Sequence, residues 1–437
     1  MLLWGDPDFA RRFAESSRLY DGDGFEVNEP LCTKMEAQPH DMVPFELLAS
    51  ARRYYDYEFE RYWHFFQVFG RLGYNTNAPA EIWQREFEKR FGKESGPWLE
   101  KALHRASQVL PRIVASCYPY RSFPMTRGWA EKQRLGDLPD YARAEGSDIQ
   151  QFANFDEEAQ MLIEGGETAK IRPTANSRWL ALKSLEVNSA VSEAEKRAGS
   201  QRGKEFDSTI TDLKILANLA LFHSRRIPAA VNYRLFERTK DAQALAEAIV
   251  YERQAIEAWR QIVAAADDFY ASDLMMGVRT ADLCGHWKDE LAALERGLAE
   301  LARRQGDLKS SPAGKAAPRF PPSTISGDGT APQVSHRPVL AAAIGKPLVV
   351  SAEVRDPAGV KWVRLRYRGV NQHQDFRTLP MLPTGEKNLY EAVIPADEIV
   401  PTWDLMYFIE AMDQDGNGRI HPDLDTETPY VVVKLQR

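Results

Sequence analysis

The spacing of apolar side chains changes along the chain. Between residues 44 and 305, apolar positions recur every three or four residues, with proline or glycine at most breaks, so this part is predicted to form packed helices. From residue 333 to 437 the apolar period is two, in short segments separated by Pro, Gly, Asp and Asn. Short strands of this kind over ~100 residues predict an immunoglobulin-like β-sandwich.

Residues 1–43 follow a third pattern, of strand, helix and strand. Leu2 to Trp4 is a short apolar segment, and Pro7 suits the first turn of a helix that continues to Leu19. Residues 25–31 form a second strand-like segment. Two short strands joined by a helix are typical of a β/α unit with parallel strands.

Two segments rich in turn residues divide the chain. Residues 306–332 are rich in Pro, Gly, Ser and Ala, which predicts a linker, whereas the aromatic residues within 118–146 predict an ordered loop. The predicted order is a β/α segment (1–43), a helical segment with this loop (44–147), a helical bundle (148–305), a linker (306–332) and a β-sandwich (333–437).

Composition narrows the class of partners. The 437 residues include 56 Lys and Arg against 63 Asp and Glu, a net charge of −7, so the basic surface that nucleic acid binding requires is not expected. No apolar run reaches the ~18 residues of a membrane span, and the first residues lack the basic and apolar regions of a signal peptide. The chain is therefore predicted to be cytoplasmic or to lack its natural start. No phosphate loop and no zinc-type cysteine pattern is evident, so no cofactor is predicted.

Two motifs near the start resemble parts of carbohydrate-active enzymes. Residues 23–31 (DGFEVNEPL), followed by Lys34 and Met35, resemble the last strand of a (β/α)8 barrel in bacterial glycoside hydrolase-like proteins. Residues 4–7 (WGDP) resemble the strand end before it.

The remainder of the chain carries two further resemblances. Residues 69–75 (FGRLGYN), with Trp83 and residues 90–92 after them, resemble the helical segment that follows the barrel in α-glucuronidase-like enzymes. Residues 404–411 and 413–418 are similar to sandwich modules appended to carbohydrate enzymes. The implied fold class is a multidomain α+β protein with a partial β/α barrel unit, a mostly α-helical middle and a C-terminal immunoglobulin-like β-sandwich.

A complete barrel has eight strands in about 250 residues, and only two candidate strands precede the helices of this chain. The resemblance therefore implies the C-terminal portion of a larger glycoside hydrolase from a periplasmic or secreted family. Such a portion would act on a poly- or oligosaccharide only together with the missing barrel, whether that lies upstream or in a separate barrel-completing chain. The isolated chain is expected to be inactive. The alternative is a non-catalytic carbohydrate-binding or scaffold protein.

The resemblance places candidate site residues at the strand ends, where barrel enzymes carry their chemistry. Glycoside hydrolysis uses two carboxylates, and Glu26 and Glu29 are the catalytic candidates. The alternative interpretation, which the lack of an evident carboxylate pair favours, is that they are polar residues satisfied by loop backbone. The candidates for substrate binding are Asn28, Lys34, Asp6 and Trp4.

Two further motifs have competing interpretations. The aromatic stripe from Tyr54 to Phe69 suits a sugar-stacking platform, but such spacing more often marks a helix core, and core is the prediction. Asp413, Asp415 and Asn417 match the opening of a calcium loop. A hairpin turn is favoured instead, because Leu424 occupies the position where a calcium loop has its bidentate Glu.

Overall fold

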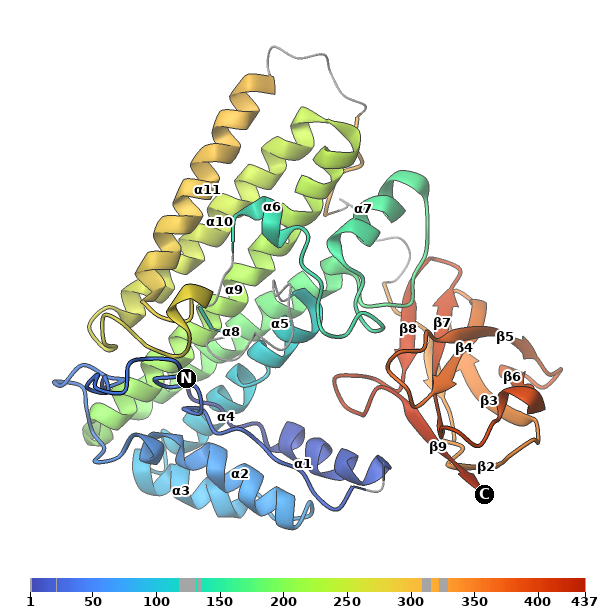
Figure 1. Ribbon diagram of the computed structural model, residues 1–437, viewed down its shortest axis with the longest axis horizontal. Helices are drawn as coiled ribbons and strands as arrows, with labels where there is room; N and C mark the ends of the chain where they lie inside the picture. The colour runs from blue at the N-terminus through green and yellow to red at the C-terminus, as the bar shows by residue number, and fades with distance from the viewer. Residues whose placement is uncertain are drawn as a thin grey trace. The chain divides into compact units, whose positions relative to one another are not determined.

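Long helices lie side by side in the larger part of the protein (Figure 1). The computed structural model describes residues 2–20, 22–117, 131–132, 136–308, 316–321 and 329–436. The chain divides into two compact units, which we call the helical unit (1–163 and 173–321) and the sheet unit (164–172 and 322–437). Parts of the predicted loop (118–130 and 133–135) and of the predicted linker (309–315 and 322–328) lie outside the described residues.

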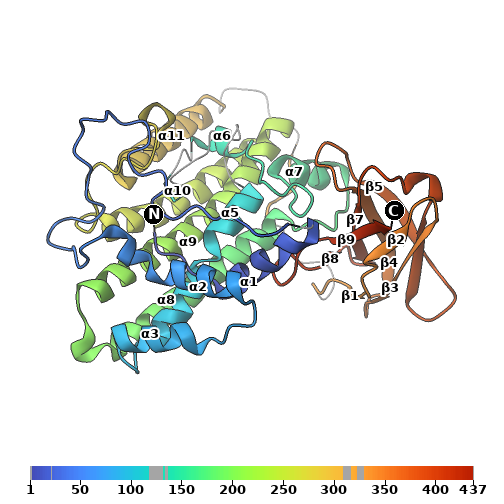
Figure 2. The ribbon, with the colours of Figure 1, turned by 60° about the horizontal axis from the view of Figure 1, so that its bottom comes forward.

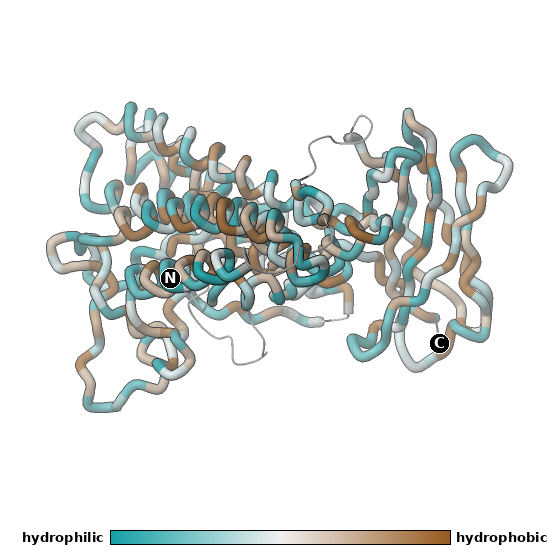
Figure 3. Tube along the Cα trace, turned by 90° about the horizontal axis from the view of Figure 1, so that it is seen from above, coloured by the Kyte–Doolittle hydropathy of each residue, from teal (hydrophilic) through white to brown (hydrophobic). Residues whose placement is uncertain are grey.

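The helical unit is built on α9, which packs against α8 and α10, while α10 also packs against α11. Apolar and hydrophilic residues alternate along the helical part of the tube in Figure 3, whereas α9 itself is buried along most of its length. The α-helices are α1 (Pro7–Ser16), α2 (Trp63–Tyr74), α3 (Glu81–Phe91), α4 (Gly96–Ala106), α5 (Val109–Cys117), α6 (Leu138–Tyr141), α7 (Phe155–Glu164), α8 (Pro173–Arg197), α9 (Lys204–Thr239), α10 (Ala242–Ala266) and α11 (Trp287–Leu308). Single 3-10 turns are η1 (Ser17–Tyr20), η2 (Glu58–Tyr62), η3 (Gly199–Gln201) and η4 (Arg279–Ala281).

The sheet unit contains one continuous sheet with the strand order β1-β3-β6-β5-β4-β7-β9-β2, and β8 pairs with β7 (Figure 2). Its strands are β1 (Gln333–Ser335), β2 (Ala341–Ala343), β3 (Leu348–Arg355), β4 (Val360–Gly369), β5 (Arg377–Pro383), β6 (Leu389–Ile394), β7 (Leu405–Asp413), β8 (Gly418–His421) and β9 (Val431–Gln436), with the 3-10 turn η5 (Ala396–Glu398) before β7.

The immunoglobulin-like sandwich is not confirmed, because β5 joins what would be two separate sheets. It pairs with β4 along most of its length and with β6 at Leu382 and Pro383. The curled sheet encloses its own core, in which alternate residues of the strands, including Val350, Leu365 and Ile409, are fully buried. The mixed α and β composition is confirmed, and the described strands all lie in the C-terminal unit.

The first 43 residues differ most from expectation. The helix is present as α1, with Pro7 in its first turn and the Asp6 carboxylate accepting from the backbone N–H groups of Asp8 and Phe9 at 3.0 and 3.3 Å. The two predicted strands are not formed: residues 24–29 have no regular structure and residues 30–37 are turns. The predicted β/α unit therefore has no strands among the residues that the structure describes.

The backbone of residues 2–5 shows why no strand forms there. The N–H groups of Leu2, Leu3 and Gly5 donate to the side chains of Glu131, Asp212 and Ser107, each at 2.8 Å. These groups are buried and need partners, and here side chains of the helical unit supply them in place of a neighbouring strand.

Candidate functional site

The predicted residues Trp4 and Asp6 lie inside the helical unit. Trp4 stacks on Phe69 at a ring-centroid distance of 5.3 Å, and its Nε1 donates to the carbonyl of Ser107 at 3.0 Å. Asp6 caps α1, and burial raises the pKa of its carboxyl. Both side chains are engaged in packing and capping contacts.

The other predicted residues lie on the irregular segment after α1. Glu26 and Asn28 are exposed, and Glu29 accepts a hydrogen bond from the Leu31 backbone N–H at 2.7 Å. Lys34 forms an ion pair with Glu58. Glu26 and Glu29 do not line the cavity beside Arg61, the cleft around Phe59 and Phe66, or the cleft around Trp403.

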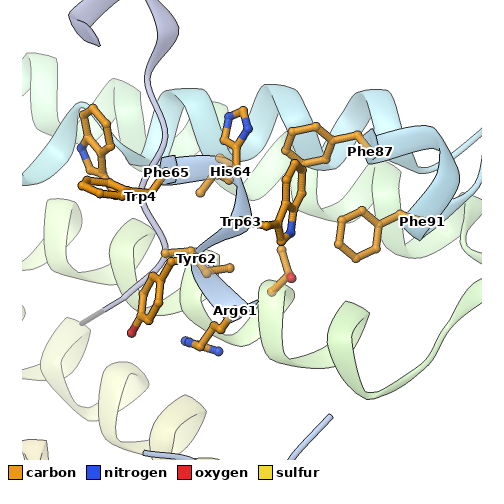
Figure 4. A pocket seen from close by; sticks show the side chains of 11 residues that line it. Trp4, Arg61, Tyr62, Trp63, His64, Phe65, Phe87 and Phe91 are labelled. Carbon is orange, nitrogen blue, oxygen red and sulfur yellow. The ribbon is translucent and has the colours of Figure 1, made fainter. Parts of the chain in front are cut away.

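A small cavity lies where the N-terminal segment meets the start of α2 (Figure 4). Its volume of about 10 Å³ holds at most about one water. Beside it, Arg61 forms a fully buried ion pair with Asp212, and Tyr270 donates a hydrogen bond to the same carboxylate. The paired charges and the small volume make this region part of the core.

An open cleft in the helical unit is the best candidate for ligand binding. We call it the aromatic cleft; its volume is about 560 Å³, within the range of about 300–1,000 Å³ that is usual for ligand pockets. Phe59 and Phe66 are 56% and 42% exposed. The lining residues are Tyr54, Tyr55, Phe59, Glu60, Trp63, Phe66, Arg90 and Glu205.

Local structure turns these aromatic rings outward. The Glu60 carboxylate accepts from the backbone N–H groups of Asp56 and Tyr57, at 3.0 and 3.2 Å, and so fixes the start of η2. Helix α2 begins only at Trp63 and buries Phe65, so Phe66 projects from another side of the helix. The change from a 3-10 turn to an α-helix within the stripe spreads its aromatic residues over several directions.

Two of the three charged groups that line the aromatic cleft form an ion pair, and the third, Glu60, leaves one negative charge. Arg90 bonds Glu205 and Glu86, both at 2.8 Å, and its guanidinium lies 4.8 Å from the Trp63 ring centroid. Burial raises the pKa of Tyr54 to about 12, so this phenol stays a neutral hydrogen-bond donor at ordinary pH. The cleft therefore offers rings and polar groups without a strong net charge.

Tyr55 adds an unsatisfied group to the same site. It is 6% exposed, and its hydroxyl has no hydrogen-bond partner among the described residues. A buried hydroxyl left without a partner costs about 1–3 kcal/mol.

Sequence reasoning recognised the aromatic stripe but predicted it to be helix core. Tyr62 and Phe65 are core residues, as predicted, whereas Phe59 and Phe66 are exposed. The helix predicted from residue 45 onward is wrong as far as residue 57, since the chain forms only turns and extended segments there. Residues 45–57 therefore carry apolar side chains at helical spacing without forming a helix.

The predicted hairpin turn is present at residues 413–418, between β7 and β8. The fully buried Asp413 carboxylate accepts from the backbone N–H and from the side-chain amide of Asn417, both at 2.7 Å. Within the described residues, no group of three or more His, Cys, Asp or Glu side chains is arranged to hold a metal ion. The Asp413 oxygens are engaged within the turn.

Comparisons with known proteins concern the fold alone. No protein-family model matches the chain, and no curated protein sequence matches it. The fold of the chain resembles part of a solved structure. That solved structure is a GH138 enzyme targeting pectin rhamnogalacturonan II, which matches with a TM-score of 0.58 at 12% sequence identity. The match covers 71% of this chain and 46% of that one, so this chain matches less than half of that enzyme's length.

Among the described helices, none combines the length and the apolar character that crossing a bilayer requires.

Proposed function

We propose that this chain is the carbohydrate-binding portion of a glycoside hydrolase-like protein and that the aromatic cleft binds the glycan. The observation that carries the proposal is the pair of exposed rings, Phe59 and Phe66, beside the ion pair of Arg90 and Glu205. One face of a pyranose ring presents C–H groups that pack on an aromatic ring, while its hydroxyls take hydrogen bonds from polar groups at the edge. The fold likeness favours a carbohydrate ligand by analogy.

We also propose that the chain binds glycan without hydrolysing it. Glycoside hydrolases place two carboxyl groups about 5–9.5 Å apart around the scissile bond. In the aromatic cleft, Glu60 caps η2 and Glu205 pairs with Arg90, so both carboxylates already have structural partners. Catalysis by Glu26 and Glu29, and completion of a barrel by another chain, stay predictions.

Binding to purified rhamnogalacturonan II and to neutral plant polysaccharides, measured by affinity electrophoresis, tests the proposal. Phe59→Ala combined with Phe66→Ala is expected to weaken binding about tenfold or more, which corresponds to ~1.4 kcal/mol. Tyr74→Ala is the matched control, since Tyr74 is 94% exposed at the end of α2 and does not line the cleft. Unchanged binding by the double variant would refute the aromatic cleft as the site.

A second measurement separates binding from catalysis. Glu26→Gln combined with Glu29→Gln is expected to leave glycan binding unchanged, and the purified chain is expected not to release reducing sugar from the polysaccharides that it binds. Release of sugar that the double substitution abolishes would establish the enzymatic alternative instead.

A further inference from the structure

The sheet unit has a cleft of its own, which we call the Trp403 cleft. Its volume is about 550 Å³, and it lies between the end of β4, the start of β5, η5 and the segment before β7. We infer that the Trp403 cleft is a second saccharide-binding site and that it selects neutral sugars over uronic acids. The inference stands on residues of the sheet unit alone, so it does not depend on the aromatic cleft.

An exposed indole forms one wall of the Trp403 cleft. Trp403 is 45% exposed and packs against the backbone of Gly369 at the end of β4. A Cβ atom at Gly369 would lie 3.2 Å from the Trp403 Cβ and 3.0 Å from Gln374 Oε1, so a larger residue would displace one of these side chains. Glycine thereby lets β4 support the indole closely at the edge of the cleft.

A fixed polar group lies on another side of the cleft. The Glu398 carboxylate accepts a hydrogen bond from the buried Tyr367 hydroxyl and forms an ion pair with Arg377 at 2.6 Å. These two partners come from β4 and β5, so they hold the carboxylate without any ligand. Preorganised polar groups of this kind fix the orientation of a bound molecule at a low cost in entropy.

The charges of the cleft decide which sugar it suits. Arg377 is neutralised by Glu398, while Arg368 donates to the Gln374 carbonyl at 2.7 Å and lies 4.4 Å from the Phe376 ring centroid. Asp375 and Asp397 line the cleft, are exposed, and have no hydrogen-bond or ion-pair partner among the described residues. Arg368 carries one positive charge and the two carboxylates carry two negative charges, so one net negative charge is left in the cleft.

A neutral pyranose complements this arrangement. Its C–H face packs on the Trp403 indole, and its hydroxyls donate to the Asp375 and Asp397 carboxylates in charge-assisted hydrogen bonds. A uronate would add a negative charge to a cleft whose lining already has three carboxylates against two guanidinium groups, and like charges repel. The cleft thus combines a stacking surface with a charge pattern that disfavours acidic sugars.

Binding of the full chain to immobilised galactan, arabinan and xyloglucan, with polygalacturonan as the acidic counterpart, tests the inference. At least one neutral polysaccharide is expected to bind, and Trp403→Ala is expected to weaken that binding about tenfold. Asp375→Asn combined with Asp397→Asn is expected to reduce the preference for neutral over acidic polymer by a similar factor. Leu382→Ala is the control, because Leu382 is 64% exposed on β5 and does not line the cleft.

The outcomes distinguish this site from the aromatic cleft. Loss of neutral-polymer binding in Trp403→Ala, with retention in Phe59→Ala, supports the inference even if the aromatic cleft binds nothing. Equal binding of wild type and Trp403→Ala to every neutral polymer, including no binding by either, overturns it. Binding of polygalacturonan as tightly as neutral polymer overturns the predicted selectivity. Thermal unfolding of each variant identifies any that fails to fold.

Discussion

A buried histidine and a half-buried one, His64 and His104, make the helical unit sensitive to acid. The rings of His64 and His104 stack with centroids 5.2 Å apart, and their Nε2 atoms are 3.0 Å apart. Burial lowers the pKa of His104 to about 4, and burial together with repulsion from His104 lowers the pKa of His64 well below its usual range. Both rings are therefore neutral in the folded protein at neutral pH.

Stability is expected to fall as the pH drops from about 6.5 toward about 4. An unfolded histidine has a pKa of about 6.5, so in this window the unfolded chain binds protons that the folded His104 does not. The free energy of unfolding, measured by urea denaturation at pH 7.5, 5.5 and 4.5, should decrease at each step. His104→Gln should make the decrease smaller. An identical pH dependence in the variant would show that His104 is not responsible.

The Asp413 turn allows a residue-level test of the calcium alternative. Asp413→Ala removes the acceptor of two hydrogen bonds from Asn417 and is expected to lower the free energy of unfolding of the sheet unit by about 1–3 kcal/mol. The exposed Asp415 has no such contacts, so Asp415→Ala should change stability by less than ~0.5 kcal/mol. Calcium chloride should leave the thermal midpoint of the wild type unchanged. A calcium-dependent rise that both substitutions abolish would instead establish a metal site.

Helix α9 shows how a neighbouring element compensates for a local defect. Pro228 lies inside this helix and has no N–H to donate to the carbonyl of Ser224, four residues earlier. That carbonyl accepts instead from the Ser177 hydroxyl of α8, at 2.6 Å. The proline is tolerated because α8 supplies the missing donor.

Removal of that donor should destabilise the helical unit. Ser177→Ala leaves the Ser224 carbonyl without a partner, and the expected loss in the free energy of unfolding is about 1–3 kcal/mol. Ser192→Ala is the matched control on α8, because Ser192 is exposed and its loss should cost less than ~0.5 kcal/mol. Urea denaturation followed by circular dichroism measures both. Equal stability of the two variants would contradict the role of Ser177.

The chain crosses between its two units more often than the predicted linear order allows. Residues 164–172, between α7 and α8, belong to the sheet unit. There the buried Ala169 packs with Phe408 and Ile420, and Glu167 forms an ion pair with Lys361. The sheet unit therefore includes a segment that residues 173–321 separate from the rest of its sequence.

Ala169→Asp is expected to destabilise the sheet unit selectively, by several kcal/mol, since it buries a charge between two apolar side chains. Limited proteolysis should then cleave the sheet unit at lower temperature, while the helical signal at 222 nm should melt as in the wild type. Glu167→Gln, in the same segment, should have an effect of about 0–1 kcal/mol, because it removes only an exposed ion pair. Simultaneous loss of the helical signal in Ala169→Asp would show that the two units unfold together.

Local patterns in the amino-acid sequence were sufficient to predict the elements whose apolar spacing and terminal residues match the secondary structure that they form. The spacing of Ile82, Trp83, Phe87 and Phe91 predicts a helix, and α3 follows it and ends at Gly92, whose φ of 83° suits glycine. The alternation in residues 348–354 and 360–367 likewise predicts β3 and β4. In these segments the apolar period and the secondary structure agree.

Packing between distant segments decided the rest. A strand needs a neighbour for its backbone groups, and around Leu2 to Gly5 the nearest groups are the side chains of Glu131, Asp212 and Ser107, so no strand forms. The exposure of Phe59 and Phe66 depends on how η2 joins α2, and the Trp403 cleft depends on elements that approach one another only in the folded sheet. The spacing of apolar residues indicates which face of an element is apolar, but the tertiary structure determines which residues that face contacts.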